Sequence, residues 1–190
     1  MNNLQIMIVG VGGQGTLLAS RVLGNVALKQ NLDVKVSEVH GMSQRGGSVV
    51  TYVKLGSKVY SPLIEKGEAD VILAFERLEA IRWADYLKND GTIIINEQRI
   101  DPMPVIIGKA KYPDGIITAL QEKLKSIVTV DALKIAKECG NLKVVNIVLI
   151  GLLAKSTDIP KDVWLGSIRE VVPAKALEVN LKAFEAGYNI

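Results

Sequence analysis

A glycine-rich segment near the N-terminus has the spacing that lets a protein backbone approach a phosphate group. Gly10 to Gly15 reads Gly-Val-Gly-Gly-Gln-Gly, between an apolar run, Leu4 to Val9, and a helix-like stretch, Thr16 to Gln30. In a strand–turn–helix context, glycines permit the sharp turn, and the helix N-terminus offers unpaired N–H groups and partial positive charge. The alternative is that the glycines only permit close packing of helix on strand. The predicted cofactor-binding residues here are Gly10, Gly12, Gly13, Gln14 and Gly15.

One acidic residue stands where a dinucleotide-binding fold often places a ribose ligand. Glu38 lies at the end of the second predicted strand, Val34 to Val39. A carboxylate at that position can accept a hydrogen bond from a ribose hydroxyl. Glu38 therefore joins the predicted cofactor-binding residues, and the alternative is a solvent-exposed carboxylate at a strand end.

A second polar loop follows that strand. The segment from His40 to Gly47 combines hydrogen-bonding side chains with glycines at the carboxyl end of a strand, where open α/β sheets bind ligands. Its arginine could clamp a carboxylate or phosphate. We predict a substrate-binding or interface loop whose contributing residues are His40, Ser43, Gln44, Arg45, Gly46 and Gly47.

Asn146 begins a strongly apolar helical stretch, Ile147 to Ala154. A buried amide needs hydrogen-bond partners. Asn146 is therefore expected either to satisfy the helix end or to reach across a subunit boundary, and we add it to the substrate or interface set.

This sequence lacks the residue combinations that most catalytic and metal sites require. One histidine and one cysteine, Cys139, cannot supply a zinc site, a disulfide or the four thiolates of an iron–sulfur cluster. The sequence also has no nucleophile elbow and no P-loop lysine. We therefore predict no catalytic residue and no metal site in this chain.

The composition of the chain limits the classes of partner that it is expected to bind. The net charge of +3 is scattered, which argues against nucleic acid, and no apolar run approaches the roughly 20 residues of a membrane-spanning helix. The N-terminus lacks the features of a signal peptide. These patterns predict a cytoplasmic protein that binds neither nucleic acid nor membrane.

The elements that must position these loops alternate between strand and helix. Further strands are predicted at Asp70 to Phe75, Thr92 to Asn96 and Ile127 to Val130, and a helix at Glu76 to Leu87. The fold class is α/β: a Rossmann-like three-layer open sheet, mostly parallel, in one domain covering residues 1–190. We expect an inserted β-hairpin (Ser48 to Leu55 returning at Lys58 to Tyr60), a turn at Asn89-Asp90-Gly91, an edge strand or loop at Asp101 to Ile107, a helix at Ile116 to Lys125, and a helical C-terminal region after Val130.

Three segments together carry a family resemblance. Ile8 to Thr16, Glu38 to Ser48 and Asn180 to Tyr188 resemble the gamma-type subunit of 2-oxoacid:ferredoxin oxidoreductases, over essentially the whole chain. Within that family, the Val-His-Gly-Met-Ser-Gln-Arg-Gly-Gly form of the second loop is similar to the beta subunit of indolepyruvate ferredoxin oxidoreductases.

The resemblance implies oxidative decarboxylation of an arylpyruvate with coenzyme A, which yields an acyl-CoA, carbon dioxide and reduced ferredoxin. Thiamine diphosphate, magnesium and iron–sulfur clusters are then expected in a larger alpha subunit, with ferredoxin reached through the complex. This chain is expected to hold no cofactor alone, to be inactive in isolation, to complete the cleft and to contact CoA through its glycine loop.

Three alternatives remain open at this point. The chain could serve a pyruvate, 2-oxoglutarate or branched-chain oxidoreductase of the same family. It could be a stand-alone NAD- or FAD-binding protein that uses the glycine loop and Glu38. It could also be a scaffold whose glycines only pack, with assembly as its sole task.

Overall fold

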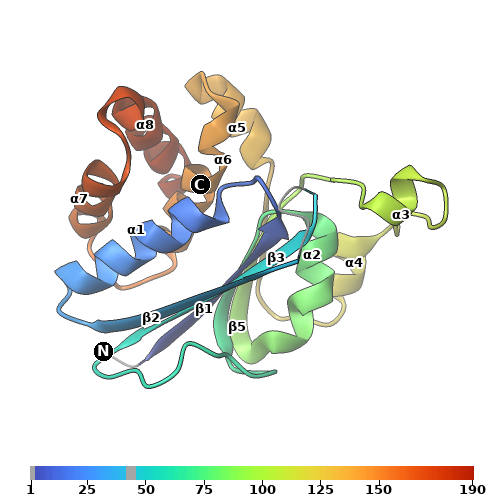
Figure 1. Cartoon of the computed structure of the whole chain (residues 1–190), viewed down its shortest axis with the longest axis horizontal. Helices are drawn as coiled ribbons and strands as arrows, with labels where there is room; N and C mark the ends of the chain where they lie inside the picture. Colours follow the sequence, from blue (N-terminus) through green and yellow to red (C-terminus); the bar gives the residue numbers. More distant parts are fainter. Residues whose placement is uncertain (1–2, 42–45) are drawn as a thin grey trace.

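The computed structural model describes residues 3–41 and 46–190, and within them a six-stranded sheet with helices on both faces (Figure 1). The strand order is β2-β3-β1-β4-β5-β6, and β3 runs antiparallel to both of its neighbours. The pairs β1–β4, β4–β5 and β5–β6 are parallel. The strands are β1 (Leu4–Val11), β2 (Asp33–His40), β3 (Ser48–Gly56), β4 (Ala69–Ala74), β5 (Leu87–Asn96) and β6 (Ile127–Val130).

Helices cover the sheet in two groups, one on each face (Figure 1). The larger group holds α1 (Thr16–Lys29), α5 (Ala132–Cys139), α6 (Val145–Lys155), α7 (Lys161–Val171) and α8 (Leu177–Tyr188). The smaller group holds α2 (Arg77–Trp83), α3 (Met103–Ile106) and α4 (Ile116–Gln121). Single 3₁₀ turns occupy Ala84–Tyr86, Leu142–Val144 and Ala174–Ala176.

The alternation of side chains along each strand divides the apolar residues between two cores. Ile6 and Ile8 of β1 pack under the larger helical group, whereas Met7 and Val9 pack under the smaller one. Successive side chains of a strand point to opposite faces, so a run that is apolar at every position indicates a sheet covered on both sides. The apolar strands of the sequence thus account for the three-layer arrangement.

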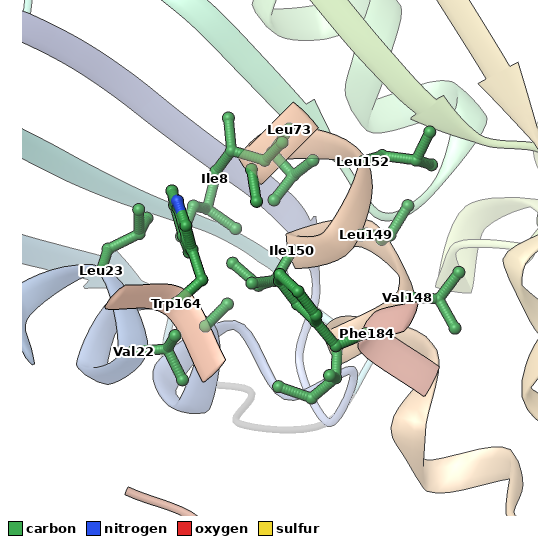
Figure 2. Packing of buried hydrophobic residues seen from close by; sticks show 14 of the residues in the cluster. Ile8, Val22, Leu23, Leu73, Val148, Leu149, Ile150, Leu152, Trp164 and Phe184 are labelled. Atoms are coloured by element: carbon green, nitrogen blue, oxygen red, sulfur yellow. The ribbon is translucent and has the colours of Figure 1, made fainter. Parts of the chain in front are cut away.

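The larger core is built around α6, whose residues from Val145 to Ala154 are all buried. Figure 2 shows Ile150 and Leu149 of this helix among Trp164 of α7 and Phe184 of α8. Full burial of each such side chain stabilises the fold by about 1.5–3 kcal/mol. A helix buried on all sides has no polar face, which explains why its sequence shows no helical periodicity.

The crossing of α6 and α8 depends on two glycines. A Cβ added to Gly151 would lie 2.3 Å from the carbonyl oxygen of Phe184, and one added to Gly187 would lie 2.0 Å from the carbonyl oxygen of Val148. Because these contacts are to backbone atoms, no side-chain rotation could relieve them. The helices therefore pack at a separation that only glycine allows.

The predicted fold class is confirmed, but the predicted hairpin is wrong. Lys58 to Tyr60 form no strand, and β3 instead pairs with β2 on one edge and with β1 on the other. Since both edges of β3 are occupied, no room is left for a returning strand. The antiparallel insertion is the β2–β3 pair, and β3 lies inside the sheet while β2 forms its edge.

Three boundaries also differ from expectation. The helix predicted to reach Leu87 ends at Trp83, because Leu87 already pairs with Ala69 as the first residue of β5. The expected turn at Asn89-Asp90-Gly91 is an irregularity within β5 rather than a connection. The segment Asp101 to Ile107 contains the short helix α3, which begins just after Pro102.

The described helices include none that combines the length and the apolar character needed to cross a lipid bilayer.

The α6–α8 contact predicts a large loss of stability from one methyl group. Gly151→Ala is expected to lower the free energy of unfolding of the full chain by about 3 kcal/mol, because the helices must move apart. Urea denaturation followed by circular dichroism measures the change.

The matched control is Gly24→Ala in α1, where an added Cβ meets nothing within 4 Å. That variant is expected to be as stable as the wild type or up to about 1 kcal/mol more stable. Equal effects of the two substitutions would contradict the packing account.

Candidate functional site

The turn between β1 and α1 requires glycine at several positions for distinct reasons. Gly13 and Gly15 have φ angles of 103° and 87°, in the left-handed region that glycine adopts without strain. A Cβ on Gly10 would lie 3.0 Å from the Cβ of Phe75, and one on Gly15 would lie 2.6 Å from Nδ2 of Asn146. Gly10 and Gly15 thus serve close packing, whereas a Cβ on Gly13 would meet nothing within 4 Å and would point into open space.

The side chain of Gln14 forms its hydrogen bonds within the protein. Its Oε1 accepts from the Val11 N–H at 2.7 Å, and its Nε2 donates to the Phe75 carbonyl at 2.9 Å. Nε2 also lies 3.2 Å from Oε1 of Gln98. Gln14 therefore ties the end of β1 to the end of β4, and it acts on a ligand only through the loop it holds.

The N-terminus of α1 keeps its positive end uncompensated. Its N-cap, Gly15, contributes no side chain, and its first turn contains no acidic residue. Within the described part of the chain, the N–H groups of Gly13, Thr16 and Leu17 have no hydrogen-bond acceptor. Unpaired amides at the start of a 14-residue helix attract an anion through both hydrogen bonding and the helix dipole.

These amides border an open hollow of about 440 Å³. It lies against the start of α1 and the carboxyl ends of the nearby strands. The residues that line the hollow are Gly12, Gly13, Gly15, Thr16, Leu17, Glu38, His40 and Val49. The structure thus brings the predicted glycine loop, Glu38 and His40 to one surface.

Glu38 reaches this hollow from β2, which is not the strand beside β1. The antiparallel strand β3 lies between them, so Glu38 is one strand spacing, about 4.8 Å, further from the glycine loop than in a sheet of order 3-2-1-4-5-6. Oε2 of Glu38 accepts from Oγ1 of Thr51 at 3.2 Å. His40 is exposed, with Nδ1 3.2 Å from the carbonyl of Gly41.

The C-terminal end of the second loop lies beside the glycine loop. Ser43, Gln44 and Arg45 lie outside the described residues. Gly46 has a left-handed φ of 75°, and its N–H donates to the carbonyl of Gly12 at 3.4 Å. The Gly12 N–H donates in turn to the carbonyl of Gly47 at 2.8 Å, so the second loop returns directly beside the first.

Asn146 is buried beneath the glycine loop rather than displayed on the surface. Its Nδ2 donates to the carbonyl of Gly15 at 3.2 Å, and its Oδ1 accepts from the N–H of Ile147 at 2.9 Å. The amide thus joins the start of α6 to the start of α1. Its expected role at the helix end fits this geometry, with the helix and the loop as its partners.

A second polar cluster, which sequence reasoning largely missed, lies beyond β4. The buried carboxylate of Glu76 accepts from Tyr112 Oη at 2.5 Å, from the Ile100 N–H at 3.1 Å and from the Glu79 N–H at 3.0 Å. Burial, and next the hydrogen bond to Glu76, raise the pKa of Tyr112 well above its usual value. The local signal was an acid that ends a strand and starts a helix, but nothing local indicated Tyr112.

Glu79 completes this cluster. Its buried carboxylate accepts from Ser48 Oγ at 2.5 Å and forms an ion pair with Arg82 at 2.7 Å. Ser48 and Glu79 line a hollow of about 350 Å³ that also includes Gly46, Gly47 and Met103. The second loop therefore borders both hollows: His40 lines the one at the start of α1, and Gly46 and Gly47 line the one beside Glu79.

Residues 3–41 and 46–190 contain no cluster of three or more His, Cys, Asp or Glu side chains that could hold a metal ion. Cys139 is half-buried and is not in a disulfide. The glycine loop and the start of α1 have a geometry suited to binding an anionic group through backbone amides.

Comparison with known proteins identifies relatives along the whole chain. The model of the family described as pyruvate ferredoxin/flavodoxin oxidoreductase matches residues 5–190. An indolepyruvate oxidoreductase subunit IorB from Pyrococcus horikoshii is 44% identical, with 98% of this chain and 95% of the relative covered. The common gamma subunit of pyruvate/ketoisovalerate oxidoreductases from Thermococcus kodakarensis is 26% identical, with 98% and 96% covered.

The fold recurs in a solved enzyme of this kind. A 2-oxoglutarate:ferredoxin oxidoreductase from Magnetococcus marinus, solved with 2-oxoglutarate, coenzyme A and succinyl-CoA bound, matches with a TM-score of 0.74 at 19% identity. The match covers 100% of this chain but 31% of that longer chain. The resemblance seen in the sequence is thereby confirmed, and the chain belongs to the pyruvate ferredoxin/flavodoxin oxidoreductase family as a subunit of a 2-oxoacid:ferredoxin oxidoreductase.

Proposed function

We propose that this chain completes the active-site cleft of a thiamine-diphosphate-dependent arylpyruvate:ferredoxin oxidoreductase, with indolepyruvate as the preferred substrate. The reaction converts the 2-oxoacid and CoA to acyl-CoA and carbon dioxide, and passes two electrons to ferredoxin. The observation that carries the proposal is the uncompensated N-terminus of α1 behind the glycine loop. In a chain without a catalytic or metal constellation in its described residues, it is the feature best suited to binding a substrate.

The glycine loop is proposed to hold a phosphate of CoA. Three backbone N–H groups at the edge of the hollow, those of Gly13, Thr16 and Leu17, have no acceptor among residues 3–41 and 46–190. The open space beside Gly13 lets an anion approach the backbone, because no side chain covers it. CoA is the co-substrate that carries phosphate groups, so it is the natural occupant.

The cofactors are proposed to belong to a larger alpha subunit. An iron–sulfur cluster usually takes four thiolates, and this chain has one cysteine. The residues present therefore do not fit a cluster, and no metal-ligand group exists among the described residues for the magnesium of thiamine diphosphate. In this arrangement the isolated chain is inactive, and ferredoxin is reduced through the partner.

The preference for an arylpyruvate rests on the relatives. Identity to an indolepyruvate oxidoreductase subunit is 44%, against 26% for a subunit shared by pyruvate and ketoisovalerate oxidoreductases. Oxidoreductases for pyruvate, 2-oxoglutarate or branched-chain 2-oxoacids are the alternatives within the family.

Two alternatives from other classes are less well supported. A stand-alone NAD- or FAD-binding protein would place Glu38 on the strand next to β1, whereas β3 occupies that position. A pure scaffold accounts for Gly10 and Gly15, which pack closely, but it does not account for a helix whose N-cap residue provides no side-chain hydrogen bond beside an open hollow.

A charge placed at the mouth of the hollow tests the CoA assignment. Leu17 is 49% exposed and lies in the first turn of α1, so its substitution leaves the core intact. In the assembled complex, Leu17→Glu is expected to raise the KM for CoA about tenfold, because its carboxylate repels the phosphate. The change is measured in steady-state assays with indolepyruvate as substrate.

Leu17→Gln is the control, since glutamine has nearly the same size as glutamate and is polar but uncharged. Its KM for CoA is expected to stay within about twofold of the wild-type value. If the two variants had the same KM for CoA, a phosphate at this helix would be ruled out while the subunit assignment stood.

The second loop is proposed to contact the substrate or the alpha subunit, with Arg45 as the anionic anchor. Support comes from the hydrogen bonds between Gly12 and both Gly46 and Gly47, which hold the returning end of this loop beside the glycine loop. Arg45→Ala is expected either to weaken the affinity between the subunits or to raise the KM for the 2-oxoacid, in each case about tenfold or more. The reason is that a charge-assisted hydrogen bond is lost. Analytical gel filtration and kinetics of the complex measure the two effects, and no change in both would reject the role.

A further inference from the structure

A hollow outside the site described above contains two arginines. It has a volume of about 200 Å³ and is lined by residues at the starts of α2 and α4. These two helices lie on the face of the sheet opposite α1 (Figure 1). Arg77 follows the carboxyl end of β4, and Arg99 follows that of β5, which is the edge where open α/β sheets bind ligands. Tyr112, Asp114 and the segment from Gly115 to Thr118 form much of the remaining wall.

The hydrogen bonding of the Arg77 guanidinium is incomplete among the described residues. Its Nε is buried and has no hydrogen-bond acceptor in the described part of the chain. No carboxylate of the described residues forms an ion pair with this side chain. A buried guanidinium N–H without an acceptor is unfavourable, so this group would gain stability from an anion in the hollow.

Two of the nearby acids, Glu76 and Asp101, are engaged with other groups. The carboxylate of Glu76 is occupied by Tyr112 and two backbone amides, and that of Asp101 accepts from Arg99 at 2.6 Å and 3.3 Å. Asp114 stands in the wall of the hollow without forming an ion pair with Arg77. Among the described residues, none of these carboxylates forms an ion pair with Arg77.

Arg99 is held in a fixed position at the same hollow. Its guanidinium lies 4.4 Å from the centre of the Tyr112 ring, and Asp101 binds it through two nitrogens. Stacking and a two-point ion pair restrict a planar guanidinium, which reduces the entropy lost when it binds a further group. The hollow therefore presents one guanidinium with two side-chain partners and one that has no partner among the described residues.

We propose that Arg77 and Arg99 form a second anion site, which binds a terminal phosphate or a carboxylate group. This site is separate from the N-terminus of α1 and does not depend on the role proposed for the glycine loop. Two guanidiniums that share one small hollow match the several oxygen acceptors of such a group. The phosphate of a coenzyme and the carboxylate of a small organic acid are the two sources with this chemistry.

Nuclear magnetic resonance of the full chain tests the site directly. The Nε–Hε signal of Arg77, identified by its loss in Arg77→Lys, and the backbone amides of Asp114 to Thr118 are followed while inorganic phosphate is added at constant ionic strength. Saturable shifts of these signals are expected. In Arg77→Gln the remaining shifts should require at least about tenfold more phosphate.

Arg169→Gln provides the matched control, since Arg169 is exposed on α7 in the other helical layer. It is expected to leave the phosphate titration unchanged. Shifts that stay linear with phosphate, or that survive in Arg77→Gln with the same midpoint, would overturn the proposal. Because the amides of Gly13 and Thr16 report on the α1 site in the same spectra, failure at one site is distinguished from failure at the other.

The two sources are separated by repeating the titration with other probes. CoA and 3′-dephospho-CoA differ by one terminal phosphate, and indole-3-acetate offers a carboxylate without phosphate. A lower midpoint for CoA than for 3′-dephospho-CoA would assign the site to that phosphate, whereas saturation by indole-3-acetate at a lower concentration than either would assign it to a carboxylate. Saturation by none of the probes at the Arg77 signal would overturn the site.

Discussion

The carboxamide of Gln14 fixes the turn on which the proposed anion-binding site depends. Its oxygen accepts from the Val11 N–H and its nitrogen donates to the Phe75 carbonyl, so one side chain joins the ends of two neighbouring parallel strands. A Cβ on Gly10 would collide with this side chain and with Phe75, which is why β1 needs glycine at its next-to-last position. With the turn held in this way, α1 begins beside the sheet, and its first amides have no acceptor in the part of the chain that the structure describes. A helix start of this kind favours a negative charge.

The insertion of β3 gives the site its particular shape. β3 separates β2 from β1, and it brings the end of the second loop against the first through hydrogen bonds between Gly12, Gly46 and Gly47. An acid on β2 is thereby displaced from the position it would occupy in a dinucleotide-binding sheet. The same insertion places Ser48, the residue after this loop, against the buried carboxylate of Glu79 in α2.

Local sequence patterns predicted the features that depend on local physics. The glycine loop follows from strand, turn and helix in succession, and the two cores follow from strands that are apolar at every position, as at Ile6 to Val9. The place of β3 was not predictable in this way, because pairing of its two edges depends on strands distant in sequence. The same reason applies to Tyr112, which meets Glu76 across 36 residues of chain. The role of Asn146 was left open because its partner, Gly15, is 131 residues away.

The central claim is that this chain works as part of a larger 2-oxoacid:ferredoxin oxidoreductase. The most direct measurement is anaerobic purification of the tagged chain from its native cells, with mass spectrometry of co-purifying proteins and an assay of viologen reduction. The account predicts a larger subunit that carries thiamine diphosphate and iron–sulfur clusters, and dye reduction that requires both indolepyruvate and CoA. Recovery of the chain alone, inactive with every 2-oxoacid and carrying a bound nicotinamide or flavin nucleotide, would contradict it.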